Sequence, residues 1–204
     1  MSTAERPRAR RKAPQERAAE ISDAARALAL EAGISAVTLR GVATRAGVTP
    51  ALVAHYSDGM DRLVADVFQR IVADERREVA SLVAVPDTAA ASMDALLDTM
   101  IDGTRDDVTL VWVEAWAHGL RNEPLAQAVR TEMDAWRDLI RDVIMRGVDS
   151  GEFRTPDPTA AAWQILGMVD GLNAQSLVRW GDSQARGSML HAAVAGVLGS
   201  RSSS

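Results

Sequence analysis

The chain has 204 residues, of which 47% are hydrophobic and 25% are charged, and its formal net charge is −5. It contains no cysteine, which excludes disulfides, cysteine-ligated zinc and thiol nucleophiles. A secretory leader and an 18-residue apolar run are also missing from the sequence, so we expect a cytoplasmic protein without a membrane partner.

The charge is distributed unevenly along the chain. Residues 1–50 carry nine basic and five acidic side chains, a balance of +4, whereas the remaining residues carry 14 and 23, a balance of −9. A basic N-terminal region on an acidic body favours contact of that region alone with a polyanion. A solubilising tail is the alternative interpretation.

Residues 1–14 are polar, without apolar periodicity, and are expected to form a disordered basic arm. From residue 15 the apolar residues follow helical spacing until Gly33, a natural C-terminal cap. Thr38 is then predicted to cap a second helix that Gly47 ends, and Thr49, followed by Pro50, to cap a third. The second and third helices match a helix-turn-helix, which predicts a DNA-binding domain over residues 15–58. A surface helical hairpin in an ordinary bundle is the alternative.

The elements become longer after residue 58. No strand pattern is present, which predicts an all-α fold with about nine helices. Residues 59–204 are expected to form a ligand-binding and dimerisation domain. Its expected helices cover about 60–83, 87–103, 105–120, 123–150, 157–181 and 185–199.

The third helix has the features of a recognition helix. Pro50 and Ala51 are small enough for close approach to bases, and Val53 is expected to face the core. Tyr56 is placed to donate a hydrogen bond to a phosphate, and Arg40, on the helix before, to reach a guanine edge.

The segment TLRGVATRAGVTPALVAHYSDGMDRLV resembles the DNA-binding signature of the tetracycline-repressor (TetR) family, and the resemblance extends over about residues 15–68. It is most similar to the choline-sensing repressors of the betaine pathway, which share the His-Tyr pair. The segments VWVEAWAHGLRNEPL and VDGLNAQSLVRW resemble the C-terminal half of that branch more loosely. Ala54, Ser57 and Met60 depart from the family, which often has Tyr, usually an aromatic residue and usually Lys there. These departures predict modest base readout.

The resemblance implies DNA contacts in the helix-turn-helix, and the predicted modest base readout leaves a further role for the basic arm. The arm side chains would enter a minor groove or contact phosphates, although an inert extension is equally compatible with the family. The implied contacts in the helix-turn-helix are Thr38, Arg40, Thr49, Pro50, Ala51, Ala54, His55 and Tyr56, and those in the arm are Arg8, Arg10, Arg11 and Lys12.

Five tryptophans suggest a ligand pocket in the body. Trp112 and Trp116 are four residues apart and share one helix face. With nearby methionines they could enclose an apolar or cationic small molecule, and Glu114 and Asn173 are further polar groups that could orient it. An ordinary tryptophan-containing core is the alternative. The expected pocket residues are Met100, Trp112, Trp116, Met133, Trp136, Trp163 and Asp170.

The resemblance also implies a homodimer formed through the last two helices. Ala193 and Gly196 permit close helix approach. The expected interface residues are Leu172, Leu190, Val194 and Val197.

The pattern gives little support to an enzyme. The three histidines lie far apart in the sequence, so we expect no catalytic residues, no metal site and no cofactor. The resemblance implies a ligand-responsive repressor that binds a palindromic operator as a homodimer and is released by a small molecule. The helix starting near Met60 is expected to be the only bridge between the two domains. A helical binding protein with a degenerate DNA-binding head and a small helical enzyme are the alternatives.

Overall fold

The computed structural model describes residues 13–199, and all the regular secondary structure in this part of the chain is helical. The expected all-α fold with nine α-helices is confirmed over these residues. The elements are α1 (Pro14–Ala32), the short 3-10 helix η1 (Ile34–Ala36), α2 (Leu39–Ala46), α3 (Pro50–Tyr56), α4 (Met60–Val83), α5 (Ala89–Ile101), α6 (Asp106–Gly119), α7 (Glu123–Ser150), α8 (Pro158–Leu177) and α9 (Ser183–Leu198).

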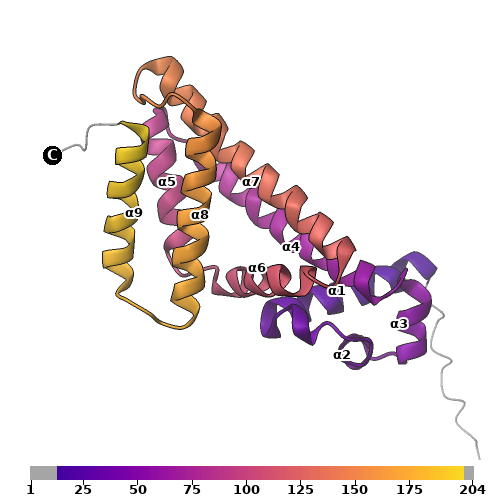
Figure 1. The fold of residues 1–204 in the computed structure, drawn as a ribbon. Coiled ribbons are helices and arrows are strands. Elements are labelled where there is room, and N and C mark those ends of the chain that lie inside the picture. The colour runs from indigo at the N-terminus through magenta and orange to yellow at the C-terminus, as the bar shows by residue number, and fades with distance from the viewer. Residues whose placement is uncertain (1–12, 200–204) are drawn as a thin grey trace, which may run out of the picture.

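The helices form a small N-terminal head and a larger body (Figure 1). The head consists of α1, α2 and α3, and it lies at one end of the molecule. The long helices α4 and α7 run side by side from the head into the body, where α5, α8 and α9 form the opposite end. Helix α6 lies across the molecule between these two ends, so it reaches both of them.

Capping residues set the ends of the short head helices, as expected from the sequence. The Thr38 hydroxyl accepts a hydrogen bond from Gly41 N at 3.0 Å, and the Thr49 hydroxyl accepts one from Leu52 N at 3.3 Å. Between α2 and α3, Gly47 adopts a left-handed φ of 64°, a conformation that favours glycine. Helix α8 ends at Leu177, four residues earlier than the sequence predicted, and Arg179 just beyond it adopts a left-handed φ of 57° that the helix could not continue through.

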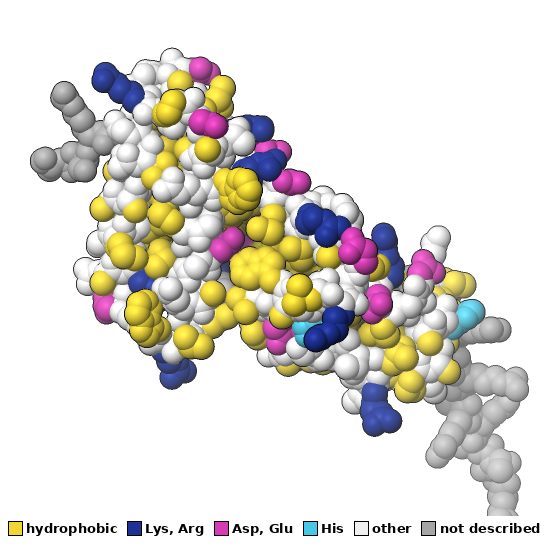
Figure 2. Space-filling view, viewed as in Figure 1, with side chains coloured by type: hydrophobic (Ala, Val, Ile, Leu, Met, Phe, Trp, Pro, Cys, Tyr) yellow, Lys and Arg dark blue, Asp and Glu magenta, His cyan; other side chains and the backbone are white. Residues whose placement is uncertain are grey.

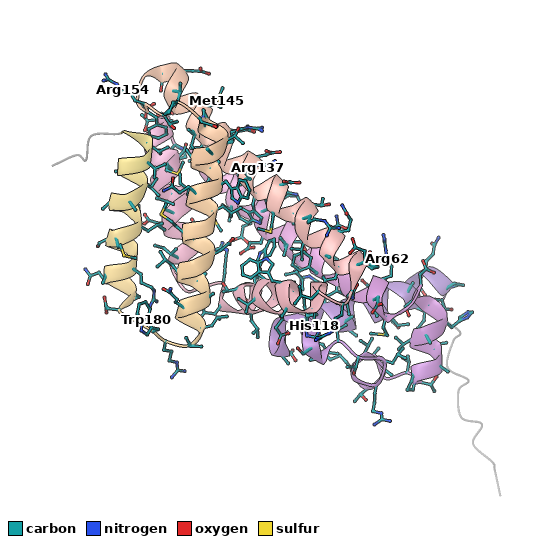
Figure 3. The ribbon with its side chains drawn as sticks, viewed as in Figure 1. Arg62, His118, Arg137, Met145, Arg154 and Trp180 are labelled. Carbon is teal, nitrogen blue, oxygen red and sulfur yellow. The ribbon has the colours of Figure 1, made fainter. Side chains whose placement is uncertain are left out.

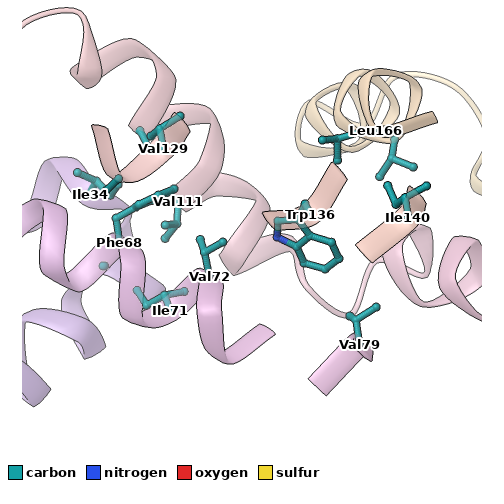
Figure 4. Packing of buried hydrophobic residues seen from close by; sticks show 14 of the residues in the cluster. Ile34, Phe68, Ile71, Val72, Val79, Val111, Val129, Trp136, Ile140 and Leu166 are labelled. Carbon is teal, nitrogen blue, oxygen red and sulfur yellow. The ribbon is translucent and has the colours of Figure 1, made fainter. Parts of the chain in front are cut away.

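A continuous hydrophobic core runs through head and body (Figure 4). Near the head, Phe68 of α4 is fully buried and meets the Trp112 ring edge-on, with the ring centroids 5.0 Å apart. Deeper in the body, Trp136 of α7 is 2% exposed and packs near Ile140 and Leu166 (Figure 4). These core contacts hold α6 and α7 together, so that their tryptophans lie close to one another in the interior of the body.

Among residues 13–199, none of the helices combines the length and the apolarity that crossing a bilayer requires.

Candidate DNA interface and ligand cavity

Helix α3 presents an exposed face of small and polar residues on the surface of the head. Val53 is fully buried and anchors the helix, as expected. Pro50, Ala51, Ala54 and His55 are exposed. Most of the side chains that would face a DNA groove are therefore exposed, while Val53 anchors the opposite face of the helix in the core.

The C-terminal end of α3 combines packing with exposure. Tyr56 is half-buried against the core, and its ring meets the His55 ring edge-on with the centroids 5.1 Å apart. The Ser57 hydroxyl donates a hydrogen bond to the Val53 carbonyl at 2.8 Å, so this residue closes the helix through a polar contact. Met60 packs onto the core. Two of the three departures from the family signature therefore serve the fold of the head.

Helix α2 adds a cationic side chain to the same end of the molecule. Thr38 and Arg40 are exposed, and within the described residues Arg40 has no ion-pair partner. Arg45, by contrast, is paired with Glu31. Thr44, which sequence reasoning did not name, is exposed one turn after Arg40 on the same face of α2. Its i, i+4 spacing from Arg40 could have identified it as a further candidate DNA contact. Arg40 is thus available for a ligand outside the chain.

The basic arm residues Arg8, Arg10, Arg11 and Lys12 lie outside the described residues.

A cavity that is partly open to solvent lies between α4, α5, α6, α7 and α8. Figure 2 shows hydrophobic side chains with an acidic group beside them in this part of the surface. Six of the seven expected pocket residues line the cavity. The lining consists of Glu75, Met100, Thr109, Trp112, Val113, Trp116, Met133, Trp136, Leu166, Asp170 and Asn173.

Trp163 does not line this cavity, contrary to the sequence-based expectation. Its side chain is 69% exposed and lies in an outer groove with Arg130 and Arg137. Trp163 shares a helix face with Leu166 and Asp170, but it lies seven residues before Asp170, about 10 Å along the axis of α8, and therefore falls in the neighbouring groove and not in the cavity.

Two carboxyl groups line the cavity, and burial raises the pKa of both. Desolvation raises the pKa of Glu75 from 4.5 to about 7, although the Arg105 charge and a hydrogen bond from Trp112 oppose the shift. Desolvation likewise raises the pKa of Asp170 from 3.8 to about 6. Both groups favour a positive partner, because a cation would stabilise the charged form that burial disfavours.

Glu75 is the cavity residue that sequence reasoning missed. It lies four residues from both Ile71 and Val79, which are buried on the inner face of α4. An acidic residue between apolar residues at i, i+4 spacing could have marked Glu75 in the sequence as an interior polar group.

Leu190 and Val194 are not on an outer surface, contrary to the expected interface. They are 1% and 2% exposed because this face of α9 packs against α5 and α8 of the same chain. Leu172 and Val197 are half-buried. The outer face of α8 and α9 carries instead Trp163, Gly167, Gly171, Met189, Ala192 and Gly196.

Two family models match the chain and cover both parts of the molecule. Residues 21–67 match the model for bacterial regulatory proteins of the tetR family, and residues 89–199 match the model for the C-terminal domain of BetI-type transcriptional repressors. The chain belongs to the TetR family. It is a transcriptional regulator, and the resemblance seen in its sequence is confirmed.

Several relatives of this TetR-family regulator are similar over most of their length. The HTH-type transcriptional repressor KstR2 of Rhodococcus jostii is 26% identical over 74% of each chain. The HTH-type transcriptional regulator YfiR of Bacillus subtilis is 26% identical over 84% of this chain and 85% of its own. A transcriptional regulator from Saccharomonospora viridis, solved in complex with choline, has a TM-score of 0.77 at 20% identity, covering 87% of this chain and 95% of its own.

The head and body of this TetR-family regulator are joined by two helices. Helix α4 continues from one into the other, and α6 also contacts α1 and η1. The Glu114 carboxylate of α6 accepts a hydrogen bond from Ser35 N at 2.8 Å, and a Cβ added at Gly33 would collide with it. Ser35 Oγ also lies 3.1 Å from His118 Nε2 (His118 is labelled in Figure 3). Helix α4 is therefore not the only bridge, and Glu114 serves the junction, not the cavity.

Proposed function

We propose that this regulator is a repressor that binds a palindromic operator as a homodimer and leaves it when a cationic small molecule fills the cavity. Residues 1–14 would form the arm, 15–58 the DNA-binding domain and 59–204 the ligand-binding and dimerisation domain, in a cytoplasmic protein. The proposal that this protein binds DNA rests on the exposed face of α3 and the neighbouring unpaired Arg40. The proposal for the ligand rests on the joint presence of half-buried carboxyl groups and tryptophans in one cavity.

The exposed head residues divide into two roles on DNA. Pro50, Ala51 and Ala54 have side chains short enough for α3 to approach the base edges. Thr38 and Thr49 use their hydroxyl oxygens to accept the capping hydrogen bonds, which leaves each hydroxyl proton for a phosphate oxygen. Tyr56 and His55 supply further phosphate donors, and Arg8, Arg10, Arg11 and Lys12 would extend the contact along the backbone.

The variant Arg40→Ala is expected to weaken operator binding roughly 10-fold, because a well-placed Arg–guanine pair contributes about 1–3 kcal/mol of discrimination. Fluorescence anisotropy with a labelled operator measures the change. The matched control is Arg146→Ala, on an exposed position of α7 far from the head, and it should leave the affinity unchanged. Equal affinities for the two variants would contradict a base contact by Arg40.

The outer face of α8 and α9 supports dimerisation with a second copy. Trp163 and Met189 are 69% and 56% exposed, which is unusual for large apolar side chains of a single chain. A Cβ added at Gly167, Gly171 or Gly196 would meet nothing. Glycines and exposed apolar side chains on α8 and α9 suit close packing against α8 and α9 of a second copy. In such a symmetric dimer, the two α3 helices would lie about 34 Å apart on DNA.

A cation matches the cavity better than a neutral ligand. A tryptophan face attracts a cation by about 0.5–2 kcal/mol per contact, and Glu75 and Asp170 supply negative charge inside. The choline found in the similar Saccharomonospora viridis protein supports a quaternary ammonium ligand. Choline is therefore the first probe.

The ligand-free protein is expected to become less stable as the pH rises from about 4 to about 7. Over this window folded Asp170 and Glu75 retain protons that the unfolded chain has released, because their pKa values rise to about 6 and about 7. Each pKa unit corresponds to about 1.4 kcal/mol. A cation should lower both values, so choline should bind more tightly at pH 8 than at pH 5.5.

Thermal unfolding and titration calorimetry at these two pH values measure both effects. The double variant Glu75→Gln/Asp170→Asn should flatten the pH dependence of stability. A choline affinity that does not change with pH would contradict the role of the two carboxyl groups.

A gel shift with DNA from upstream of the protein's own coding sequence tests the proposal as a whole. We expect a shift that strengthens at low salt and is reversed by choline. The absence of a shift at any salt concentration would overturn DNA binding by this head.

A further inference from the structure

The long helices α4 and α7, which run side by side in Figure 1, share an apolar interface that contains a buried ion pair. Glu132 of α7 is 3% exposed, and it is the one charged residue that is buried among residues 13–199. Its carboxylate accepts a hydrogen bond from Arg76 Nε of α4 at 3.3 Å. The Arg76 side chain is 28% exposed, so its charge is only partly withdrawn from water.

The neighbours of this pair on both helices are hydrophobic. Val72 and Val79 of α4 are buried one turn to either side of Arg76 (Figure 4). Trp136 of α7 is buried one turn after Glu132. Burial of such side chains stabilises the interface in proportion to the apolar area and without a preferred direction. These contacts therefore distinguish only weakly between positions of α4 that differ by one turn along α7.

The buried carboxylate, in contrast, tolerates only one register of the two helices. Glu132 has lost its hydration and is stabilised only while the Arg76 guanidinium stays within reach. A slip of α4 by one turn would move Arg76 by about 5.4 Å and leave the carboxylate buried without a partner. Among residues 13–199, the other hydrogen bond between α4 and the start of α7 runs from Asn122 Nδ2 to the Asp61 carbonyl at 3.2 Å. It is exposed, so water can replace it.

We propose that Arg76 and Glu132 are a positioning pair, which fixes the register of α4 against α7 and thereby the place of the head relative to the body. Helix α4 continues into the head, and Arg76 lies about 24 Å along this helix from Met60. A pair at one point prevents α4 from sliding but permits it to tilt. The positioning role needs neither ligand nor operator, whereas its consequence for operator binding rests on the proposed function.

The test variant replaces both charges by apolar side chains of similar length, Arg76→Met together with Glu132→Leu. Such a replacement of a buried ion pair is often neutral or stabilising, so we expect the thermal unfolding temperature to stay the same or to rise. The double variant should nevertheless lose its single head position. The matched control is Arg130→Met with Glu123→Leu, the same changes in an ion pair that is exposed and lies within α7.

Double electron–electron resonance between two spin labels measures the position of the head. The chain has no cysteine, so Ala19→Cys in α1 and Asp149→Cys near the end of α7 provide unique, exposed attachment sites. An excess of unlabelled protein restricts the signal to distances within one chain. We expect one narrow distance in the otherwise unmodified protein and in the control. The double variant should add a second distance that differs by up to about 5.4 Å, one helical turn.

The conservative variant Glu132→Gln keeps an oxygen acceptor for Arg76 Nε and should retain the single distance. Operator anisotropy on the unlabelled proteins then connects position with function. The apparent affinity of the double variant should fall in proportion to the fraction of molecules that keep the original distance, because only these are competent to bind.

Two results would overturn the positioning role. One is a double variant with the same single distance as the unmodified protein, which would show that apolar packing alone fixes the register. The other is a clear loss of its thermal stability, which would assign the pair to the fold as a whole. A second distance in the double variant, combined with failure of the unmodified protein to bind its operator, would support the positioning role and overturn the proposed function instead.

Discussion

The variant Gly171→Glu is expected to convert the protein into a monomer and to weaken operator binding by about 10²–10⁴-fold, the range that linking two binding modules commonly provides. Gly171 lies on the outer face of α8 with open space around its missing Cβ. A carboxylate there would face its own copy across the two-fold axis, where desolvation and like-charge repulsion oppose association. Within one chain the substitution is tolerated, because the position is exposed and glutamate favours helix more than glycine.

Sedimentation velocity and operator anisotropy on the same samples measure the two effects together. The control is Gln127→Glu, which adds the same charge at an exposed position of α7 outside the proposed interface. It should remain dimeric and bind the operator normally. A Gly171→Glu protein that stays dimeric would show that copies associate through another surface.

The variant Glu114→Ala should separate ligand binding from operator release. Glu114 accepts a hydrogen bond from Ser35 N beside α1, whereas Trp112 and Trp116 of the same helix line the cavity. If ligand binding shifts α6, the shift would pull directly on the segment before α2. Coupling energies between sites are typically 1–3 kcal/mol, so choline is expected to weaken operator binding about 5–150-fold in the unmodified protein and hardly at all in the variant.

Calorimetry should show that Glu114→Ala still binds choline, and anisotropy should show that it stays on the operator. The conservative variant Glu114→Gln retains an oxygen acceptor for Ser35 N and should recover part of the release. Loss of choline binding in Glu114→Ala would place this residue in ligand recognition. Normal release would instead assign the coupling to α4 alone.

The helix boundaries could be predicted closely because they depend on local chemistry. Thr38 and Thr49 cap α2 and α3 with their own hydroxyls, and Gly47 ends α2 in a left-handed conformation. These effects act within one turn, so neighbouring residues suffice to locate them. The same locality explains why Val53 could be placed on the inner face of α3.

The orientation of the C-terminal helices could not be predicted in the same way. Helices α8 and α9 are apolar on several faces, and periodicity alone does not show which face meets the chain and which meets solvent. Leu190 and Val194 turn inward, whereas Trp163 turns outward. The contacts that decide this include those of α9 with α5, which is far away in the sequence.

The junction also depends on contacts distant in the sequence. Ser35 and Glu114 are 79 positions apart, and no pattern around either residue indicates the other. Glu75 is an intermediate case, because its position in an apolar face was visible but the cavity that gives it a role was not.

The length of α4 amplifies small movements. Its 24 residues span about 36 Å at 1.5 Å per residue, and Glu75 at the cavity lies about 22 Å from the head end at Met60, so a rigid tilt of about 5° at the cavity would displace the head by roughly 2 Å. In the proposed two-fold dimer both heads would move, which would change their separation by up to twice that amount and shift them relative to consecutive major grooves. Under the proposed function, a rotation small enough to be accommodated by side chains around one bound molecule would thus weaken recognition of a site many times longer.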